Sequence, residues 1–294
     1  MTNAAVVVHH REGRIRSSDG LLLFEQSWAP ATPRAVVGLV HGYAEHSSRY
    51  DATARCLARD GYAVQTLDLR GHGRSEGKRC FVSDFREYLS DVDAVLQRAA
   101  RSWPERPVFL MGHSLGGLIA LLFVIERSVP LSGLILSAPS VRLGSDFSPF
   151  KARVSELLGR TFPGFPTVKF RSESLSSDEN VVQAYRDDEL VYRGRTPART
   201  ASEIIRTIRA VQERMHRIEL PLLVMHGADD QVADVEGSRQ LYEGARSADK
   251  SLRIYDGFYH EIMNEPEKAI VLGEISAWLN ARDLAHRSGR RPNQ

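Results

Sequence analysis

Short runs of apolar residues recur along the chain, and most of them are followed by segments whose apolar positions repeat with a helical period. Uninterrupted apolar runs of about four to eight residues are typical of strands buried on both faces, as in a parallel sheet. Their alternation with helices predicts an α/β fold, in which a mostly parallel sheet is flanked by helices. The strands are expected within residues 35–40, 62–67, 108–111, 131–136, 222–225 and 252–255.

Two helices and a hairpin are visible in the spacing of single residues. Ser83 is the expected N-cap of the first helix. An antiparallel hairpin is expected at residues 13–28, on the edge of the sheet, with a Ser-Asp-Gly turn at 18–20. The apolar faces of the two helices are formed by Phe85, Leu89, Val92 and Leu96, and by Val271, Ile275, Trp278 and Leu279.

The alternation of strands and helices stops between about Ser140 and Ile218, where apolar runs give way to Ser, Arg, Asp and scattered Phe residues. A strand pattern resumes after Pro221, so the intervening segment is inserted within one domain. We therefore expect an α/β core of residues 1–139 and 219–282, an inserted helical cap, or lid, of residues 140–218, and a flexible basic tail of residues 283–294.

Composition narrows the class of protein. The 39 basic and 37 acidic residues nearly balance, which gives no reason to expect a nucleic-acid partner. Two cysteines, Cys56 and Cys80, are too few for a disulfide framework, and they favour a reduced, cytoplasmic setting. The N-terminal residues lack the apolar core of a signal peptide, and no run approaches the ~18 apolar residues of a membrane span. We expect a soluble protein that is at most peripherally bound to a membrane.

A candidate nucleophile lies in Gly112-His113-Ser114-Leu115-Gly116, which matches G-x-S-x-G. In this strand-turn-helix elbow the glycines allow a tight turn that projects the serine hydroxyl. The apolar run 108–111 precedes the motif and 118–123 continues as a helix, as an elbow requires. The alternative is a glycine-rich turn that carries a serine by chance.

A serine hydroxyl needs a base to act as a nucleophile, and the base must be oriented by a third group. In α/β-hydrolase order the acid and then the histidine follow the serine. The turn after strand 222–225 supplies two acids, Asp229 and Asp230. His260 is the ordered histidine downstream of them, in the loop after strand 252–255, so it is the expected base.

Acyl transfer also needs N–H donors aimed at the developing oxyanion. The amide of Leu115, directly after the nucleophile, is one expected donor. The second is expected from the loop after strand 35–40, where Gly42 allows a sharp turn, and we assign it to the amide of Tyr43.

These motifs together resemble the monoacylglycerol lipases of the α/β-hydrolase fold, especially the bacterial members. The resemblance rests on three blocks, HGYAEHSSRY at 41–50, DLRGHGRS at 68–75 and GHSLGG at 112–117, and covers roughly residues 12–282. The same blocks occur in lysophospholipases. The resemblance implies that Ser114 is the nucleophile, His260 the base and Asp230, rather than Asp229, the acid. It also places four polar residues near the glycerol end of the substrate, namely Glu45, Arg49, His113 and Tyr185.

The cap contains five of the 11 Phe residues within one short part. Phe147 and Phe150 lie on one helical face with Val154, Leu157 and Leu158, and we assign these two Phe residues to substrate binding. Such a face would form an acyl-chain tunnel or a lid that touches lipid; alternatively, it packs the cap onto the body.

The sequence predicts a serine esterase of single-acyl-chain lipids that hydrolyses monoacylglycerol to glycerol and fatty acid. The alternatives are a lysophospholipase, another carboxylesterase or acyltransferase, or a non-catalytic lipid-binding homologue. No organic cofactor is expected. No metal is expected either, because His260-Glu261-Ile262-Met263-Asn264 has Asn at the position where H-E-x-x-H zinc sites have their second histidine ligand. Transient contact of the cap with a membrane or micelle is expected; the oligomeric state is left open.

Overall fold

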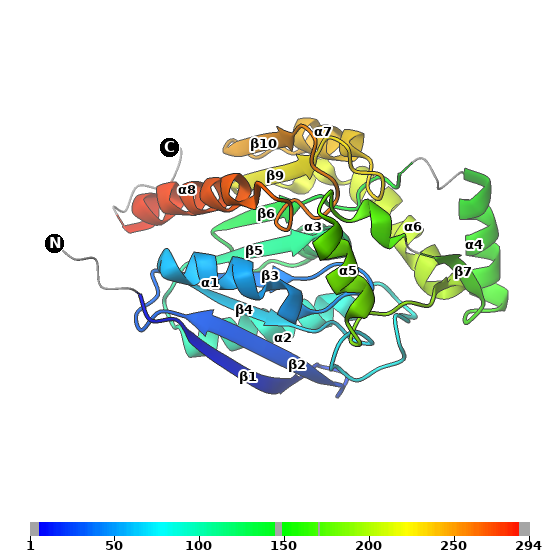
Figure 1. Ribbon diagram of the computed structural model, residues 1–294, viewed down its shortest axis with the longest axis horizontal. Helices are drawn as coiled ribbons and strands as arrows, with labels where there is room; N and C mark the ends of the chain where they lie inside the picture. The colour runs from blue at the N-terminus through cyan, green and yellow to red at the C-terminus, as the bar shows by residue number, and fades with distance from the viewer. Residues whose placement is uncertain (1–5, 145–148, 170, 288–294) are drawn as a thin grey trace.

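The computed structural model describes residues 6–144, 149–169 and 171–287. Within them, the main sheet has eight strands in the order β1-β2-β4-β3-β5-β6-β9-β10 (Figure 1). The strand pairs are parallel from β4 to β10, whereas β2 runs antiparallel to both β1 and β4. The six predicted strands are β3 (Ala35–Val40), β4 (Tyr62–Leu67), β5 (Val108–His113), β6 (Gly133–Ser137), β9 (Leu222–Gly227) and β10 (Lys250–Tyr255).

Helices cover both faces of the sheet, as the alternating pattern predicted. One face packs against α1 (Asp51–Arg59), which follows the short 3-10 helix η1 (Ser47–Tyr50), and against α8 (Lys268–Arg287). The other face packs against α2 (Glu87–Ser102), α3 (Leu115–Glu126) and α7 (Val235–Gly244). The central strands are buried on both faces, which explains their continuous apolar runs.

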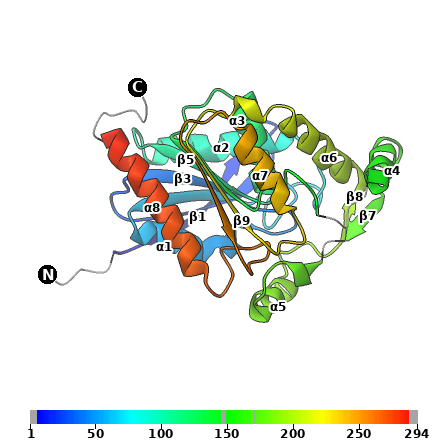
Figure 2. The same ribbon diagram turned by 90° about the horizontal axis from the view of Figure 1, so that it is seen from above.

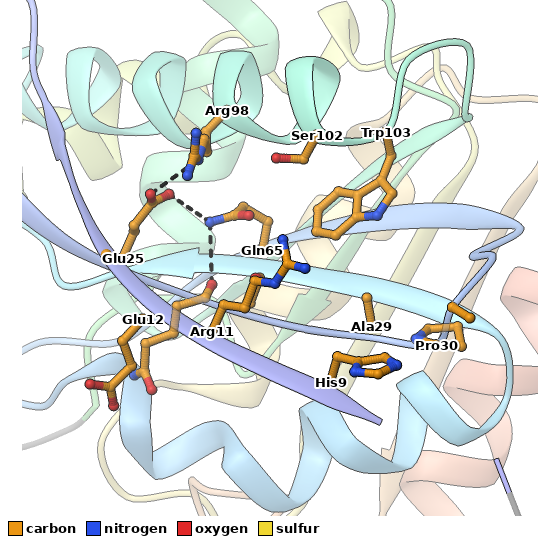
Figure 3. A pocket seen from close by; sticks show the side chains of 14 residues that line it. His9, Arg11, Glu12, Glu25, Ala29, Pro30, Gln65, Arg98, Ser102 and Trp103 are labelled. Carbon is orange, nitrogen blue, oxygen red and sulfur yellow. Dashed lines mark hydrogen bonds and ion pairs between the residues drawn. The ribbon is translucent and has the colours of Figure 1, made fainter. Parts of the chain in front are cut away.

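The predicted hairpin is formed by β1 (His9–Arg16) and β2 (Leu22–Ala29) at the edge of the sheet. A cavity of about 390 Å³ lies between this hairpin and the C-terminal end of α2 (Figure 3). Its buried carboxylate, Glu25, accepts hydrogen bonds from Arg98 Nε at 3.0 Å and Gln65 Nε2 at 2.9 Å. Burial raises the pKa of Glu25 although Arg98 acts against this. This arrangement joins α2 to the sheet edge.

The start of α2 differs from the prediction. The helix begins at Glu87 with Arg86 at the N-cap position, so Ser83 is not the cap. Instead, the Ser83 hydroxyl donates to the carboxylate of Glu87, which also accepts the N–H of Asp84 at 3.0 Å. The side chain of Glu87 therefore reaches back to the preceding turn. There it accepts a backbone N–H, the role that was expected of Ser83.

The inserted segment lies between two strands that pair directly, β6 and β9. The helix α6 packs onto α3 in the main core, and α4 packs on the outer side of α6, away from the sheet (Figure 2). The insertion contains α4 (Pro149–Thr161), β7 (Pro166–Lys169), η2 (Ser172–Ser174), α5 (Glu179–Asp187), β8 (Arg195–Pro197), α6 (Ala198–Gln212) and η3 (Met215–Arg217).

The C-terminal segment corrects the expected start of the tail. The helix α8 continues to Arg287, into the segment that the composition assigned to a tail from residue 283. Asp283 is almost completely buried, and its carboxylate lies 3.7 Å from Arg34 Nη1. This contact holds residue 283 against the core. The basic composition of the segment does not reveal such a contact, so it placed the boundary too early.

Candidate active site

Ser114 stands at a sharp turn between β5, which ends at His113, and α3, which begins at Leu115. Its φ of 53° lies in the left-handed region that non-glycine residues rarely adopt. The flanking glycines are required by close backbone contacts: a Cβ on Gly112 would lie 2.3 Å from the carbonyl oxygen of Gly116. The glycines of the motif thus hold the serine in the strained elbow that the sequence predicted.

The three side chains nominated for the catalytic triad are brought together. His260 Nε2 lies 2.8 Å from Ser114 Oγ, and His260 Nδ1 lies 2.7 Å from Asp230 Oδ2. Asp230 follows β9 and His260 follows β10, so both come from loops at the carboxyl ends of neighbouring strands. Asp229 is exposed to solvent, and Asp230 is the acid that contacts the histidine.

Charge is distributed asymmetrically along this hydrogen-bonded chain. Burial lowers the pKa of His260, but the attraction and hydrogen bond of Asp230 outweigh it, so the pKa is raised above its ordinary value. Burial raises the pKa of Asp230, yet the neighbouring imidazoles of His260 and His226 leave it far below its usual range. Asp230 therefore stays ionised and can stabilise an imidazolium on His260.

The two expected oxyanion donors come from loops that meet at Ser114. Leu115 is the first residue of α3, so its N–H has no acceptor within the helix and is available to an external oxygen. The loop that carries Tyr43 lies directly against the nucleophile, because a Cβ on Gly42 would lie 3.3 Å from the Cβ of Ser114. Glu45 Oε1 accepts the N–H of Gly42 at 2.6 Å and fixes this loop.

A buried ionic network lies next to the triad. Arg49 donates to Glu45 at 2.7 Å and to both oxygens of Glu261 at 2.6 and 2.8 Å. The ring of Tyr185, from α5, lies 4.8 Å from the Arg49 guanidinium carbon. Burial alone would raise the pKa of Glu45, but Arg49 lowers it to about 2. Three of the residues expected at the glycerol end, Glu45, Arg49 and Tyr185, are thus linked in one cluster.

His113, the fourth of these residues, lies beside the base. Its ring centroid is 4.8 Å from that of His260, and its Nδ1 lies 3.1 Å from the Ser137 hydroxyl. Burial and the proximity of His260 lower the pKa of His113 to about 4. His113 is therefore neutral near pH 7 and adds a polar but uncharged surface next to the base.

The apolar residues of the cap are only partly within the described residues. Phe147 lies outside them, and Phe150 is the second residue of α4, with a side chain that is also outside them. Val154 and Leu157, from the same predicted face, are 39% and 65% exposed. Leu158, also on this face, is partly buried, so the described part of the face is exposed at Val154 and Leu157 and partly covered at Leu158.

Three polar residues near the triad were not singled out for the site from the sequence. Ser140 Oγ lies 3.2 Å from Ser114 Oγ, Glu261 binds Arg49, and His226 Nε2 lies 3.0 Å from Asp230 Oδ2. Glu261 directly follows the predicted base, which was an available signal. The position of Ser140 depends on how the loop after β6 folds back, and spacing does not reveal it. Among the described residues, no cluster of His, Cys, Asp and Glu could hold a metal ion.

The chain is similar to known proteins over most of its length. The model of the family Hydrolase_4, described as serine aminopeptidase, S33, matches residues 31–267. The chain is 38% identical to a monoacylglycerol lipase of Mycolicibacterium smegmatis, over 88% of this chain and 93% of that one. It is 32% identical to the phospholipase YtpA of Bacillus subtilis, over 86% of this chain and 97% of that one.

Solved structures place the architecture in the same group. The crystal structure of Paleococcus ferrophilus monoacylglycerol lipase superposes with a TM-score of 0.81 and 30% identity, covering 88% of this chain and 99% of that one. The α/β-hydrolase fold predicted from the sequence is thereby confirmed.

Proposed function

Because the chain belongs to the Hydrolase_4 family, alongside the monoacylglycerol lipases, we propose that it cleaves monoacylglycerols to glycerol and a free fatty acid. It is a carboxylic ester hydrolase. The observation that carries the proposed mechanism is the continuous hydrogen-bonded chain from Ser114 Oγ through His260 to Asp230, which is the arrangement that a serine nucleophile needs.

In the proposed reaction, Ser114 Oγ attacks the ester carbonyl while His260 Nε2 takes the hydroxyl proton. Asp230 holds the imidazole and stabilises its positive charge. The amides of Tyr43 and Leu115 bind the oxyanion of the tetrahedral intermediate. His260 then protonates the leaving glycerol oxygen, which leaves an acyl-enzyme. A water molecule, deprotonated by His260, then attacks the acyl carbonyl and forms a second tetrahedral intermediate. When this intermediate collapses, His260 returns the proton to Ser114 Oγ and the fatty acid is released.

The alcohol side of the ester is assigned to the polar cluster beside the base. Glycerol offers hydroxyl groups, and the cluster offers the carboxylate of Glu45, the guanidinium of Arg49, the imidazole of His113 and the phenol of Tyr185. Because Glu45 and Arg49 are already paired with each other, they form a pre-ordered polar surface. Such a surface can orient a glycerol group at little entropic cost.

The acyl side is assigned to the cap, together with transient contact with a membrane or micelle. Exposed apolar side chains gather in α4 and the loop after it, where Leu157, Phe162 and Phe165 are each at least half exposed. Each buried methylene is worth ~0.8 kcal/mol, so contact of these residues with lipid favours capture of a long acyl chain.

Within the described ranges, no helix is long and apolar enough to cross a bilayer. With Cys56 and Cys80 both free thiols, we assign the enzyme to the cytoplasm.

Replacement of the nucleophile tests the proposal. Ser114→Ala is expected to abolish monoacylglycerol hydrolysis and covalent labelling by a fluorophosphonate, with the unfolding transition retained. Ser140→Ala is the matched control, because Ser140 Oγ lies 3.2 Å from Ser114 Oγ but has no direct role in the proposed chain. Turnover by purified Ser114→Ala would contradict the assignment. Wild-type protein that takes no fluorophosphonate would instead support the non-catalytic lipid binder.

A second candidate substrate, a lysophospholipid, is favoured by a basic pocket on the cap. This cavity of about 420 Å³ is lined by the end of β7, by η2, by α5 and by residues 192–194, and Tyr185 lies both in its lining and against Arg49. Its charged lining residues are Lys169, Arg171, Arg186 and Arg193, against one acid, Glu173. Guanidinium and ammonium groups suit the phosphate of a lipid headgroup.

Paired substrates separate the two candidates. If the pocket binds a substrate phosphate, Lys169→Ala is expected to lower kcat/KM for a lysophospholipid roughly five-fold and to leave monoacylglycerol unchanged. Arg160→Ala, at an exposed position of α4, is the control. Equal effects on both substrates would exclude the pocket as a headgroup site.

A further inference from the structure

The carboxylate of Asp230 contacts two imidazoles, and the proposed mechanism uses only one of them. Asp230 Oδ2 accepts from His260 Nδ1 at 2.7 Å and lies 3.0 Å from Nε2 of His226. The other oxygen, Oδ1, accepts the backbone N–H groups of Val232 and Ala233 at 2.7 and 3.0 Å. His226 is the penultimate residue of β9 and, like the Asp230 side chain, is inaccessible to solvent.

The surroundings of His226 decide which ring nitrogen carries the proton. Nε2 faces two acceptors, Asp230 Oδ2 and the carbonyl oxygen of Ala233 at 3.1 Å, so it must be the donor. Nδ1 lies 2.7 Å from the hydroxyl of Ser238, a buried residue of α7 that can donate to it. The ring therefore carries a proton on Nε2, and Nδ1 is placed to receive a hydrogen bond from Ser238.

We propose that His226, with its tautomer set by Ser238, is a positioning residue that orients Asp230 toward His260 and reduces the basicity of the Asp230–His260 pair. This inference rests on the proposed function of Asp230 and His260. The buried Asp230 carboxylate accepts three hydrogen bonds and has His226 Nε2 3.0 Å from Oδ2, so it cannot rotate away from the base without losing these contacts. His226 touches neither Ser114 nor the proposed substrate side, so it acts through Asp230.

Sharing one oxygen between two imidazoles has a chemical consequence. The N–H of His226, 3.0 Å from Oδ2, partly offsets the negative charge that His260 experiences, which limits how strongly Asp230 raises the basicity of His260. Removal of this donor should make His260 more basic and keep it protonated to higher pH. The groups that act on His260 are Asp230, Glu261, Glu45 and His113, and only the first contacts His226.

The test compares His226→Leu and His226→Gln, with rates normalised to the fraction of Ser114 that a fluorophosphonate titrates. For His226→Leu, kcat/KM for a soluble ester at optimum pH is expected to fall roughly ten-fold, and the acid limb to move up by about half to one pH unit. His226→Gln keeps an N–H donor and should restore most of both values. His216→Gln, at an exposed position in η3, is the control.

Normalisation separates this inference from the proposed function. If no variant and no wild-type enzyme were labelled or active, the proposed function would fail; if the labelled fraction of His226→Leu had an unchanged pH profile, only the positioning role would be overturned. Should His226→Leu not fold, ¹⁵N–¹H correlation of labelled histidines in the wild type decides the matter. A proton on Nε2 of His226 supports the inference, whereas one on Nδ1 alone overturns it.

Discussion

At the scale of single residues, the protonation state of His260 governs when Ser114 can be activated. The base must be neutral, and the pKa of His260 is raised by Asp230 despite burial, so activity should increase with pH through a midpoint above the ordinary value of 6.5. Asp230→Asn removes the attraction but leaves the burial, so the midpoint should move below that value. It should also cost about 10³ to 10⁴ in kcat because the amide favours the wrong tautomer.

The adjacent acid supplies the matched control for this prediction. Asp229→Asn changes an exposed neighbour that does not contact the base, so kcat and the acid limb should remain as in the wild type. Both variants are measured as kcat/KM against pH with a soluble short-chain ester. Loss of activity in Asp229→Asn, with Asp230→Asn unaffected, would reverse the assignment of the acid.

The sequence could nominate Ser114 and His260 because each follows a recognisable strand, and chain order restricts the candidates. It could not choose between Asp229 and Asp230 by spacing, because both occupy the same turn and only the backbone path decides which one faces His260. The sequence did not single out His226 for the site. Its contact with Asp230 depends on the turn after β9, which no period in the sequence describes.

At the scale of elements, two glycines in helices predict opposite outcomes for the same substitution. In α4, a Cβ on Gly159 would lie 2.8 Å from Ser202 Cβ and 2.9 Å from the carbonyl oxygen of Ala198, both in α6. In α8, a Cβ on Gly273 would meet nothing within 4 Å. Gly159→Ala should therefore destabilise the α4–α6 contact by about 1–3 kcal/mol, whereas Gly273→Ala should stabilise by ~0.5–1 kcal/mol.

Two measurements test the two effects. In hydrogen exchange, Gly159→Ala should reduce the amide protection of α4 and leave that of β3 and β5 unchanged. In denaturant unfolding, Gly273→Ala should raise the free energy of unfolding. Equal protection of α4 in Gly159→Ala and the wild type would show that the helix contact is looser than its geometry implies.

The contact through Gly159 also bears on the two interpretations that the helical pattern left open. The apolar face of α4 suggested either a lipid surface or the side that packs, and the small residues Ser155 and Gly159 carried no signal in a hydrophobic period. Small residues allow helices to approach closely, so here Ser155 and Gly159 are buried, whereas Val154 and Leu157 are exposed. The strands could be predicted more reliably because each is a short apolar run that alternates with segments of helical period.

At the scale of the whole molecule, the exposed apolar residues are unevenly placed. Val154, Leu157, Phe162, Phe165 and Val168 are all exposed in the cap, between α4 and the end of β7. Clustered exposed apolar side chains mark interaction surfaces, whereas scattered ones need no explanation. The inserted segment thus presents an exposed apolar surface, and the α/β core carries the proposed chemistry.

This division predicts that substrate capture and chemistry can be separated by mutation. Leu157→Glu or Phe162→Glu should weaken binding to phospholipid vesicles and raise the apparent KM for micellar long-chain monoacylglycerol, each roughly ten-fold, since a charge replaces apolar area that would enter lipid. With a soluble short-chain ester, kcat/KM should stay within two-fold, roughly the scatter of a surface substitution.

Ile270→Glu is the matched control, because Ile270 is 55% exposed but lies in α8. If Ile270→Glu weakened vesicle binding as much as Leu157→Glu, non-specific charge repulsion would account for the effect. If neither cap variant changed the micellar KM, α4 would have no part in lipid contact, and the acyl chain would have to reach Ser114 without help from this exposed surface.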